Sequence, residues 1–488
     1  MRAPGTRATS KNVIARLLVS AIVILTASCT RPDGDASATG SRPSRPPNLV
    51  YVMADDLGWR DLGSYGQTKI ETPRLDRMAA EGLRFTQYYA GSTVCAPSRA
   101  TLMTGLHTGH AWIRGNGEVP LRPEDVTVAE VLKKAGYATG MVGKWGLGLE
   151  DNDGRPDRQG FDFSWGVLHH VHAHRQYTDH LFRNGERVEV PLDRHVNDLF
   201  TEQALDFIRR SREGPFFLYL AYTAPHAELR VLEESIAPYR GRFPEVPFVN
   251  EKADAAFPAR PPWTWAGYRS QPEPRAAYAG MVSRLDRDVG RLLDLLEELG
   301  LGDDTIVFFT SDNGPHQEGG HDPHFFPSAE PLRGIKRDLY EGGIRVPMIV
   351  RGPGRVPAGQ TSDAVWAHWD VLPTLAELAG AEAPSGLDGV SVRSAVLTST
   401  AASDHAPLYW EFHERGFEQA ARMGKWKAVR HGLDRPVELY DLEADLSETA
   451  DVAGSHPDVV ARVEAFLASA RTESTRWPVA ARSSSGSD

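Results

Sequence analysis

The stretch NLVYVMADD (48–56) decides the fold of this chain. It is an apolar run rich in β-branched and aromatic residues, and two carboxylates follow it at once. The stretch TIVFFTSDNG (305–314) repeats the pattern far downstream. Such runs are typical of strands buried on both faces of a sheet. Because sites form at the carboxyl ends of parallel strands, we expect the polar residues after these two runs to lie together. They are Asp55, Asp56, Asp312 and Asn313.

Further strand and helix patterns alternate along the chain. Apolar runs that predict buried strands lie at 137–145, 215–226 and 346–354. Amphipathic patterns that predict helices lie at 75–82, 127–136, 199–210 and 281–300. This alternation predicts an α/β fold, a large and mostly parallel sheet sandwiched by helices, and we assign it to 48–403. Lys144 and His226 also fall at the carboxyl ends of predicted strands.

The C-terminal part of the chain has a different pattern. Small polar residues occupy 401–406, and short strand-like runs and a helical pattern follow. We expect a small α+β subdomain at 404–477 and a disordered tail at 478–488.

The N-terminus resembles an export signal. A basic segment precedes the run LLVSAIVILTASC (17–29), which is too short to span a bilayer comfortably. Small residues lead into Cys29, as in the lipobox of bacterial lipoproteins, although Thr26 stands where leucine is usual. We expect a lipoprotein-type signal peptide at 1–28, lipidation of Cys29 and a flexible tether at 29–47, with ordinary signal cleavage or a short anchor as the alternatives.

The formal net charge of the 488-residue chain is -11, and 41% of its residues are hydrophobic. A nucleic-acid-binding protein usually presents a basic face, so this charge gives no reason to expect nucleic acid as a partner. The chain therefore has the composition of a globular protein, and with the N-terminal signal we expect it to be exported and to meet a membrane only through a lipid anchor.

One of the two cysteines, Cys95, opens the stretch CAPSRATLMTG (95–105). If Cys29 carries lipid, Cys95 has no partner for an intramolecular disulfide. Pro97 suits the first turn of a helix, which puts Cys95 at a helix N-terminus that attracts anions. Arg99 follows four residues later on the same helical face. A reactive group beside a fixed guanidinium suits an anionic ester as substrate.

The stretch CAPSR resembles the signature of the type I sulfatases of the alkaline phosphatase superfamily. The resemblance extends from 48 to the final helix. It implies that a formylglycine-generating enzyme oxidises Cys95 to Cα-formylglycine before folding is complete. It also implies a metal site that combines residue 95 with Asp55, Asp56, Asp312 and Asn313. Carboxylate and amide oxygens suit Ca²⁺ best here, with Mg²⁺ as the alternative.

Other motifs resemble the family in order, with one departure. The stretch GKWGLG (143–148) resembles a family segment that implies sulfate binding by Lys144, but Gly146 replaces the usual histidine. A histidine-rich segment (169–180) follows, and by its resemblance to related bacterial sulfatases we expect His174 to replace the missing base, with His172 as the second choice. TAPHAELRVLEES (223–235) implies His226 as general acid, and PLRGIKRDLY (331–340) implies Lys336 as a second sulfate-binding lysine.

The resemblance implies hydrolysis of a sulfate monoester, either a sulfated carbohydrate or an aryl sulfate. It also implies that the hydrated aldehyde accepts the sulfuryl group and then eliminates sulfate. Two alternatives stay open. A phosphonate or phosphate ester hydrolase of the same superfamily would share the motifs, and a non-catalytic lipoprotein that binds sulfated glycans would explain Gly146. We also expect Trp112 or Arg114 to contact a substrate at the mouth of the pocket.

Overall fold

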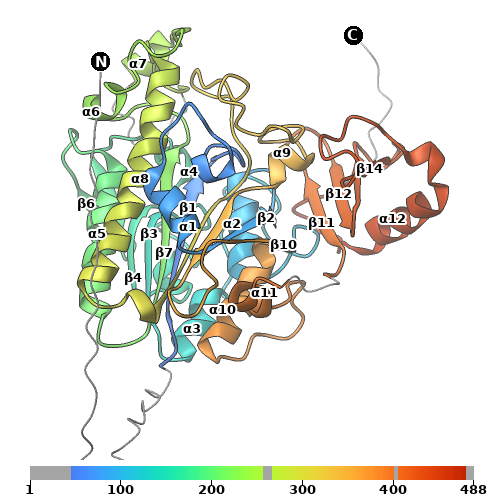
Figure 1. Ribbon diagram of the computed structural model, residues 1–488, viewed down its shortest axis with the longest axis horizontal. Coiled ribbons are helices and arrows are strands. Elements are labelled where there is room, and N and C mark those ends of the chain that lie inside the picture. The colour runs from blue at the N-terminus through green and yellow to red at the C-terminus, as the bar shows by residue number, and fades with distance from the viewer. Residues whose placement is uncertain (1–44, 257–265, 401–404, 480–488) are drawn as a thin grey trace, which may run out of the picture. The chain divides into compact units, whose positions relative to one another are not determined.

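The computed structural model describes residues 45–256, 266–400 and 405–479 (Figure 1). The predicted signal peptide, Cys29, most of the predicted tether and the last residues of the predicted tail lie outside these ranges. Within them no helix combines the length and the apolar character that a membrane crossing requires.

A ten-stranded sheet carries the fold. Its order is β10-β2-β9-β8-β1-β7-β3-β4-β5-β6. Five neighbouring pairs are parallel, including the central β8-β1-β7-β3-β4 block, as the apolar runs predict. Strand β9 runs antiparallel to both its neighbours, and β5 and β6 extend the far edge as an antiparallel hairpin. The strands are β1 (Asn48–Asp55), β2 (Leu83–Tyr89), β3 (Ala138–Lys144), β4 (Phe163–Val167), β5 (His180–Arg183), β6 (Glu186–Glu189), β7 (Phe216–Pro225), β8 (Thr305–Ser311), β9 (Met348–Arg351) and β10 (Gln360–Ala367).

Strand β1 shows why these residues lie at the centre. All eight of its residues are buried. Its side chains alternate between two hydrophobic clusters, because successive residues of a strand point to opposite faces. Val50 and Val52 belong to one cluster, and Leu49 and Tyr51 belong to the other. A strand that is apolar on both faces needs a helical layer on each side.

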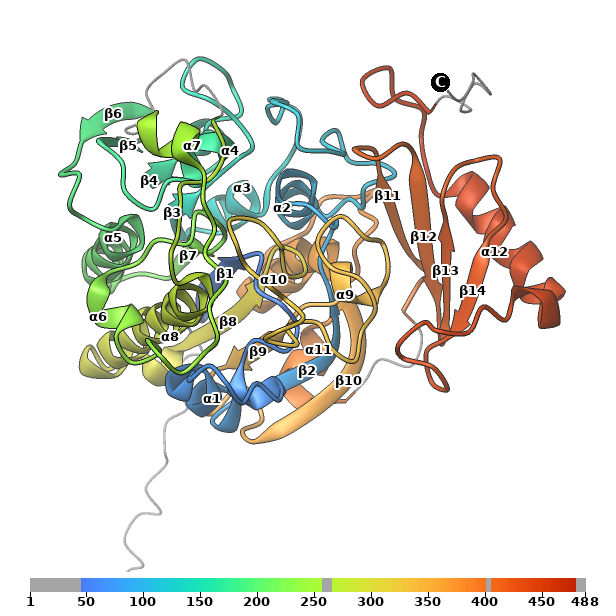
Figure 2. The same ribbon diagram turned by 90° about the horizontal axis from the view of Figure 1, so that it is seen from above.

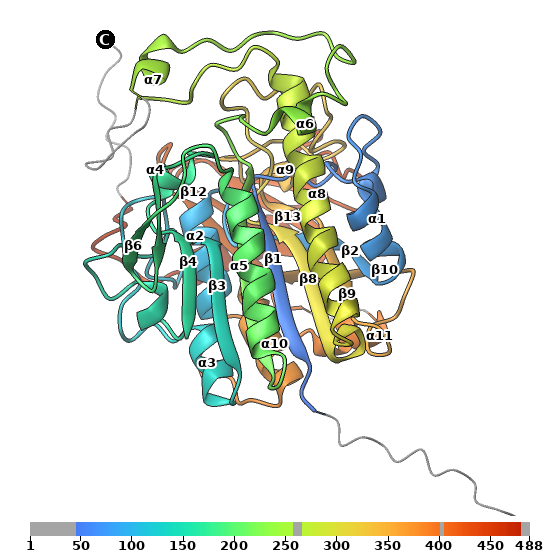
Figure 3. The ribbon, with the colours of Figure 1, turned by 90° about the vertical axis from the view of Figure 1, so that its left-hand side faces the viewer.

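Helices supply both layers. One face is covered by α1 (Pro73–Ala80), α5 (Val196–Ser211) and α8 (Pro274–Glu298), of which α5 and α8 lie in front of the sheet in Figure 3. The other face is covered by α2 (Cys95–Thr104), α3 (Val128–Lys134), α10 (Val371–Ala379) and α11 (Arg393–Thr398). Short helices lie in the connecting segments: α4 (His170–Ala173), α6 (Glu233–Ile236), α7 (Glu251–Ala255) and α9 (Glu341–Ile344). The 3-10 turns are Gly63–Tyr65, Pro156–Arg158, Gly302–Asp304, His368–Asp370 and Ala453–Ser455.

A second, antiparallel sheet follows, and Figure 2 shows it beside the large one. Its strands are β11 (Leu408–Phe412), β12 (Glu418–Met423), β13 (Trp426–Arg430) and β14 (Glu438–Asp441), and α12 (Pro457–Ser469) covers one face. The other face packs on the main body through a cluster that includes Trp410 and Trp369. The Trp410 indole N–H also donates to the carbonyl of Ala90 at 2.9 Å. This packing brings the turn between β11 and β12 to the edge of the site described next.

Candidate active site

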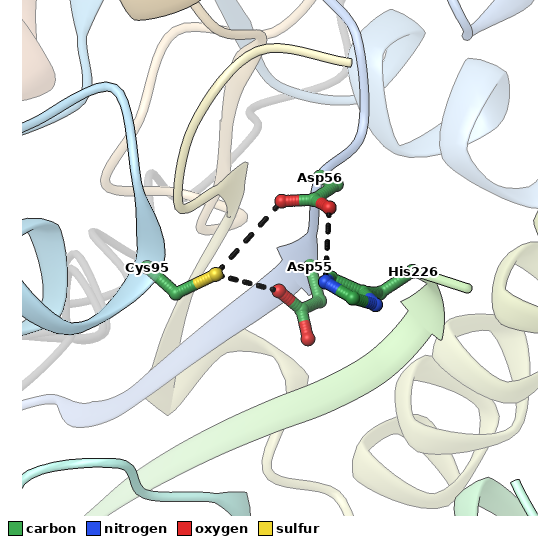
Figure 4. A group of neighbouring side chains, drawn as sticks. All are labelled: Asp55, Asp56, Cys95 and His226. Carbon is green, nitrogen blue, oxygen red and sulfur yellow. Dashed lines mark hydrogen bonds and ion pairs between the residues drawn. The ribbon is translucent and has the colours of Figure 1, made fainter. Parts of the chain in front are cut away.

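The ends of β1, β7 and α2 converge on one cluster of side chains. Asp55 is the last residue of β1, Asp56 follows it with a left-handed φ of 64°, and Cys95 begins α2. The Cys95 Sγ lies 3.5 Å from Asp55 Oδ1 and 3.9 Å from Asp56 Oδ1. His226 follows β7, and its Nε2 lies 3.3 Å from Asp56 Oδ2 (Figure 4). Residues from distant parts of the chain therefore face one another, as the strand-end pattern predicts.

Cys95 lies at the predicted helix N-terminus and is 5% exposed. Pro97 sits in the first turn of α2, where its missing N–H costs nothing. Burial raises the pKa of the Cys95 thiol well above its usual range, although Lys144 and Lys336 oppose this shift. An unmodified cysteine at this position would therefore carry its proton at neutral pH and be a poor nucleophile.

Three buried cations surround the carboxylates. The Arg99 guanidinium donates to Asp312 Oδ2 at 2.7 and 3.0 Å. Lys144, the last residue of β3, lies 2.7 Å from Asp55 Oδ2. The Nζ of Lys336 lies 2.6 Å from Asp56 Oδ2.

These contacts set an electrostatic balance. Burial raises the pKa of Asp55 to about 7 against the attraction of Lys144. For Asp312, burial is outweighed by Arg99 and Lys144, which hold its pKa below the usual range. Three carboxylates face three cations, so a divalent metal would leave the site with an excess of positive charge. An anionic sulfate ester would offset that excess.

The donor set fits a hard divalent cation. Asn313 Nδ2 donates to Asp56 Oδ1 at 2.6 Å, while Asn313 Oδ1 is buried and has no hydrogen-bond partner in the described part of the chain. Ligand atoms of Asp55, Asp56, Cys95 and His226 lie within 4.8 Å of one another. A buried amide oxygen without a donor, beside carboxylates, is the environment that Ca²⁺ or Mg²⁺ prefers. This cluster contains Asp55, Asp56 and Cys95 of the five residues named from the sequence and adds His226, while Asp312 and Asn313 contact Asp56 beside it.

His226 and His174 form the histidine pair of the site. Their rings stack with centroids 4.4 Å apart. Lys336 Nζ and His226 Nε2 are 3.0 Å apart. Burial and the nearby lysines lower the pKa of His226 well below its usual value, and burial followed by His226 does the same for His174. Both rings are therefore neutral at neutral pH.

The histidine-rich segment divides between the site and the interior. His174 and His170 line the cavity described below. His172 is fully buried elsewhere, with its Nε2 2.8 Å from Thr178 Oγ1. Of the two histidines that the sequence offered as the replacement base, His174 is the one that lies at the cluster.

One buried carboxylate ties the two histidine segments together. Glu228 accepts hydrogen bonds from Arg175 at 3.0 Å and from Arg269 at 2.8 and 2.9 Å. The Glu228 backbone N–H also donates to the carbonyl of His174 at 3.1 Å. The side chain of Gln176 donates to the carbonyl of His226 at 3.1 Å. These contacts fix the backbone on either side of the stacked rings.

A cavity of about 560 Å³ leads to this cluster. It is lined by Cys95, Asn116, Lys144, His170, Val171, His174, His226, Tyr268, Glu318, Lys336, Arg337 and Glu414. Neither Trp112 nor Arg114, which we expected to contact a substrate, is among the residues that line this cavity. Arg114 is buried against Glu411 at 2.9 Å, and the Trp112 carbonyl accepts from the Trp477 indole.

Sequence reasoning missed the outer lining of the cavity. Glu318 follows the SDNG motif by four residues and Arg337 adjoins Lys336, so proximity to known motifs could have indicated both. Tyr268 and Glu414 lie in irregular segments far from any motif, and no pattern in the sequence marks them.

Comparisons with known proteins agree with this geometry. The family model described as Sulfatase matches residues 47–381, and the model described as N-sulphoglucosamine sulphohydrolase, C-terminal, matches 335–473. An arylsulfatase of Hemicentrotus pulcherrimus is 34% identical over 431 residues, which cover 81% of this chain and 70% of that protein. An N-acetylgalactosamine-6-O-sulfatase of Bacteroides thetaiotaomicron is 29% identical over 520 residues, which cover 88% of this chain and 94% of that protein.

A solved structure is similar over nearly the same extent. Ps i-CgsB, in complex with k-i-k-neocarrahexaose, superposes with a TM-score of 0.74 at 28% identity, covering 89% of this chain and 95% of that one. The fold, the cluster at the strand ends and these matches lead to one conclusion: the chain belongs to the sulfatase family, whose members hydrolyse sulfate esters.

Proposed function

We propose that this protein hydrolyses the sulfate ester of a carbohydrate, through a formylglycine made from Cys95 and with a divalent cation. The observation that carries the proposal is the contact of Cys95 with Asp55 and Asp56 among Arg99, Lys144 and Lys336. A carbohydrate substrate is supported by the relatives' names, which specify an N-acetylgalactosamine-6-O-sulfatase and a complex with a neocarrahexaose.

Residue 95 supplies the nucleophile in this proposal. As its hydrate, the aldehyde made from Cys95 would offer one hydroxyl to accept the sulfuryl group and a second to release it. A serine or cysteine would lack that second group, which is the reason for the modification. Arg99 fixes the position of Asp312 and lies 3.7 Å from Asp55 Oδ1, so it aligns the carboxylates around residue 95.

The two lysines and the two histidines act on the ester. Lys144 pairs with Asp55 and Lys336 with Asp56, and both stabilise the charge of the transferring sulfuryl group. Lys336 donates to His226 Nε2, so this pair holds a proton where the departing alcohol oxygen needs one. His174, stacked on His226, takes the role of the histidine that is missing at Gly146.

Asp55, Asp56, Asp312 and Asn313 would hold the cation, together with the modified residue 95. The ion would supply a positive charge that polarises an oxygen of the reacting groups. We favour Ca²⁺ over Mg²⁺, because this set of carboxylates and an amide oxygen suits flexible coordination.

The test of the proposed function is the mass of residue 95. Protein from a host that makes formylglycine is digested with trypsin, and the peptide FTQYYAGSTVCAPSR is measured. We expect an oxygen in place of the sulfur, aldehyde reactivity and turnover of 4-nitrophenyl sulfate. An unmodified thiol in protein that still turns over would refute the formylglycine route. A modified residue without turnover of any sulfate ester would refute the proposed activity.

We also propose that the protein is exported and anchored by lipid at Cys29, on the strength of the basic and apolar segments that precede this residue. Labelling with a radioactive fatty acid should mark the wild type and leave the C29A variant unlabelled. Equal labelling of both would contradict the assignment.

A further inference from the structure

The cavity has a buried inner end and a partly exposed outer end. At the inner end Cys95, Lys144 and Lys336 are each at most 5% exposed. At the outer end the side chains of Arg337 and Glu414 are 31% and 30% exposed. The proposed chemistry uses only the inner residues. The outer residues therefore face whatever part of the substrate carries the ester.

Two crossed ion pairs hold the outer wall in place. Arg337 Nε lies 3.5 Å from Glu414 Oε2, and Arg415 NH1 lies 3.1 Å from Asp338 Oδ1. The large domain thus contributes the basic residue to the first pair and the acidic residue to the second, and the β11–β12 turn contributes the opposite charge to each. The backbone N–H of Asn116 also donates to Glu414 Oε1 at 3.4 Å. The turn of the second sheet therefore forms one wall of the cavity beside Lys336.

The charges of this wall are unsuited to a second anion. Arg337 donates to Glu318 as well as pairing with Glu414, so two carboxylates share one guanidinium. His170, the other basic group on this side, has a pKa lowered to about 4 by burial and by His169. Among the outer residues that line the cavity in the described part of the chain, Arg337 is the one cation, and Glu318 and Glu414 already share it. A second anion would therefore meet these carboxylates without a cation of its own.

The same wall is suited to hydroxyl groups. An ionised carboxylate offers about four lone-pair positions, and the described contacts of Glu414 use one on each oxygen. The Oδ1 of Asn116 accepts from the Ala96 N–H at 2.9 Å, which leaves its amide NH₂ as a donor. Tyr268 adds an aromatic ring to the lining. Carboxylate acceptors, an amide donor and an aromatic ring are groups that bind an uncharged sugar ring.

We propose that Glu414 is a specificity-determining residue that, with Glu318 and Asn116, binds hydroxyl groups of the sugar bearing the sulfate ester and disfavours a sugar with a second anionic group beside it. This inference rests on the proposed function and narrows its substrate class to esters of locally uncharged sugars.

The experiment compares three substrates in the formylglycine-containing enzyme. They are 4-nitrophenyl sulfate, N-acetylgalactosamine 6-sulfate and N-acetylgalactosamine 4,6-disulfate. For the wild type we expect kcat/KM to favour the monosulfate over the disulfate by about tenfold or more, since like charges brought together in a partly buried site repel strongly. The sugars are also tested as inhibitors of 4-nitrophenyl sulfate turnover, so that binding is measured independently of cleavage.

Two substitutions locate the effect. E414Q removes the charge and keeps the shape, so we expect the preference for the monosulfate to fall about tenfold. Its turnover of 4-nitrophenyl sulfate, a substrate without sugar hydroxyls, is measured alongside, and the preference is expressed relative to that turnover. The matched control is E418Q, four residues away on β12, where the carboxylate faces His431 and does not line the cavity.

Four results of this experiment would contradict the proposed role of Glu414. A wild type that prefers the disulfate, or an E414Q variant with an unchanged preference, would overturn the inference. Loss of disulfate binding in R337M would also overturn it, because Arg337 would then be an anion receptor. Sugars that neither react nor inhibit would contradict it too. If none of the three substrates is turned over, the proposed function is refuted. If 4-nitrophenyl sulfate is turned over but one of the results above contradicts the role of Glu414, only this inference is refuted.

Discussion

The substitution E228Q tests whether the buried clamp behind the two histidines serves catalysis. Glu228 is fully buried and accepts from two arginines that are 2% and 7% exposed. Glutamine keeps the size of the side chain and removes the charge. Both guanidiniums then stay buried without their counterion, next to the backbone that carries His174 and His226.

The expected magnitude follows from this geometry. Removing one partner of a buried ion pair costs about 3–5 kcal/mol of unfolding free energy, because the remaining charge is left uncompensated. Such a loss favours open arrangements of the two histidine segments. A displacement of reacting groups by about 1 Å can lower turnover about 100-fold, and we expect a fall of that order in kcat with little change in KM.

The assay pairs urea unfolding with turnover of 4-nitrophenyl sulfate, and E411Q is the matched control. Glu411 is also fully buried, with Arg114 at 2.9 Å and Arg471 at 3.0 Å, but it lies in the second sheet and does not line the cavity. Both variants should lose a similar amount of stability, and only E228Q should lose kcat. If E228Q unfolds as easily as E411Q yet keeps the wild-type kcat, the clamp contributes stability alone and the reasoning is wrong.

Three further predictions follow from the site and its surroundings. H174A should lower kcat about 10²–10⁴-fold, which is the usual contribution of a positioned acid or base. H172Q should leave kcat nearly unchanged, because His172 faces Thr178 in the interior. Equal losses of kcat for the two variants in steady-state assays would contradict the assignment of His174. Removal of divalent cations should abolish turnover, and addition of Ca²⁺ should restore it. The N313A variant should need a higher Ca²⁺ concentration for the same recovery. Full activity in excess chelator would show that the reaction needs no divalent cation. Burial alone would raise the pKa of Glu411, but His413, Arg114 and Arg471 lower it to about 2. The contribution of this carboxylate to stability is therefore present above about pH 4.5 and is lost as the pH falls toward 2. The difference in unfolding free energy between wild type and E411Q should shrink by up to about 3 kcal/mol over that range, and a constant difference would refute this.

The inner site could be predicted from the sequence because its residues follow strands. Asp55 and Asp312 end two apolar runs whose parallel pairing forces them to one edge of the sheet. Cys95 and Arg99 follow from helix periodicity once Pro97 marks the first turn. For the two aspartates the outcome follows from a local pattern and one rule about parallel sheets, and for Cys95 and Arg99 it follows from the geometry of one helix.

Other features have no local cause. The short run of β9 is as apolar as its neighbours, and nothing in Met348–Arg351 tells a parallel from an antiparallel strand. Glu414 reaches the cavity only because Trp410 and its neighbours dock the second sheet on the first. Its position therefore depends on tertiary packing between residues far apart in the chain, which periodicity does not report.

If Cys95 is oxidised as proposed, its burial sets an order of events in the cell. In the folded protein this side chain, at the first residue of α2, is buried against two carboxylates at the inner end of the cavity, where a second enzyme cannot enclose it. Under the proposed chemistry, the oxidation of residue 95 must therefore precede the closure of the fold. A host without the maturing enzyme would make a protein of normal stability that is permanently inactive. Yield and activity would then be independent properties of the preparation.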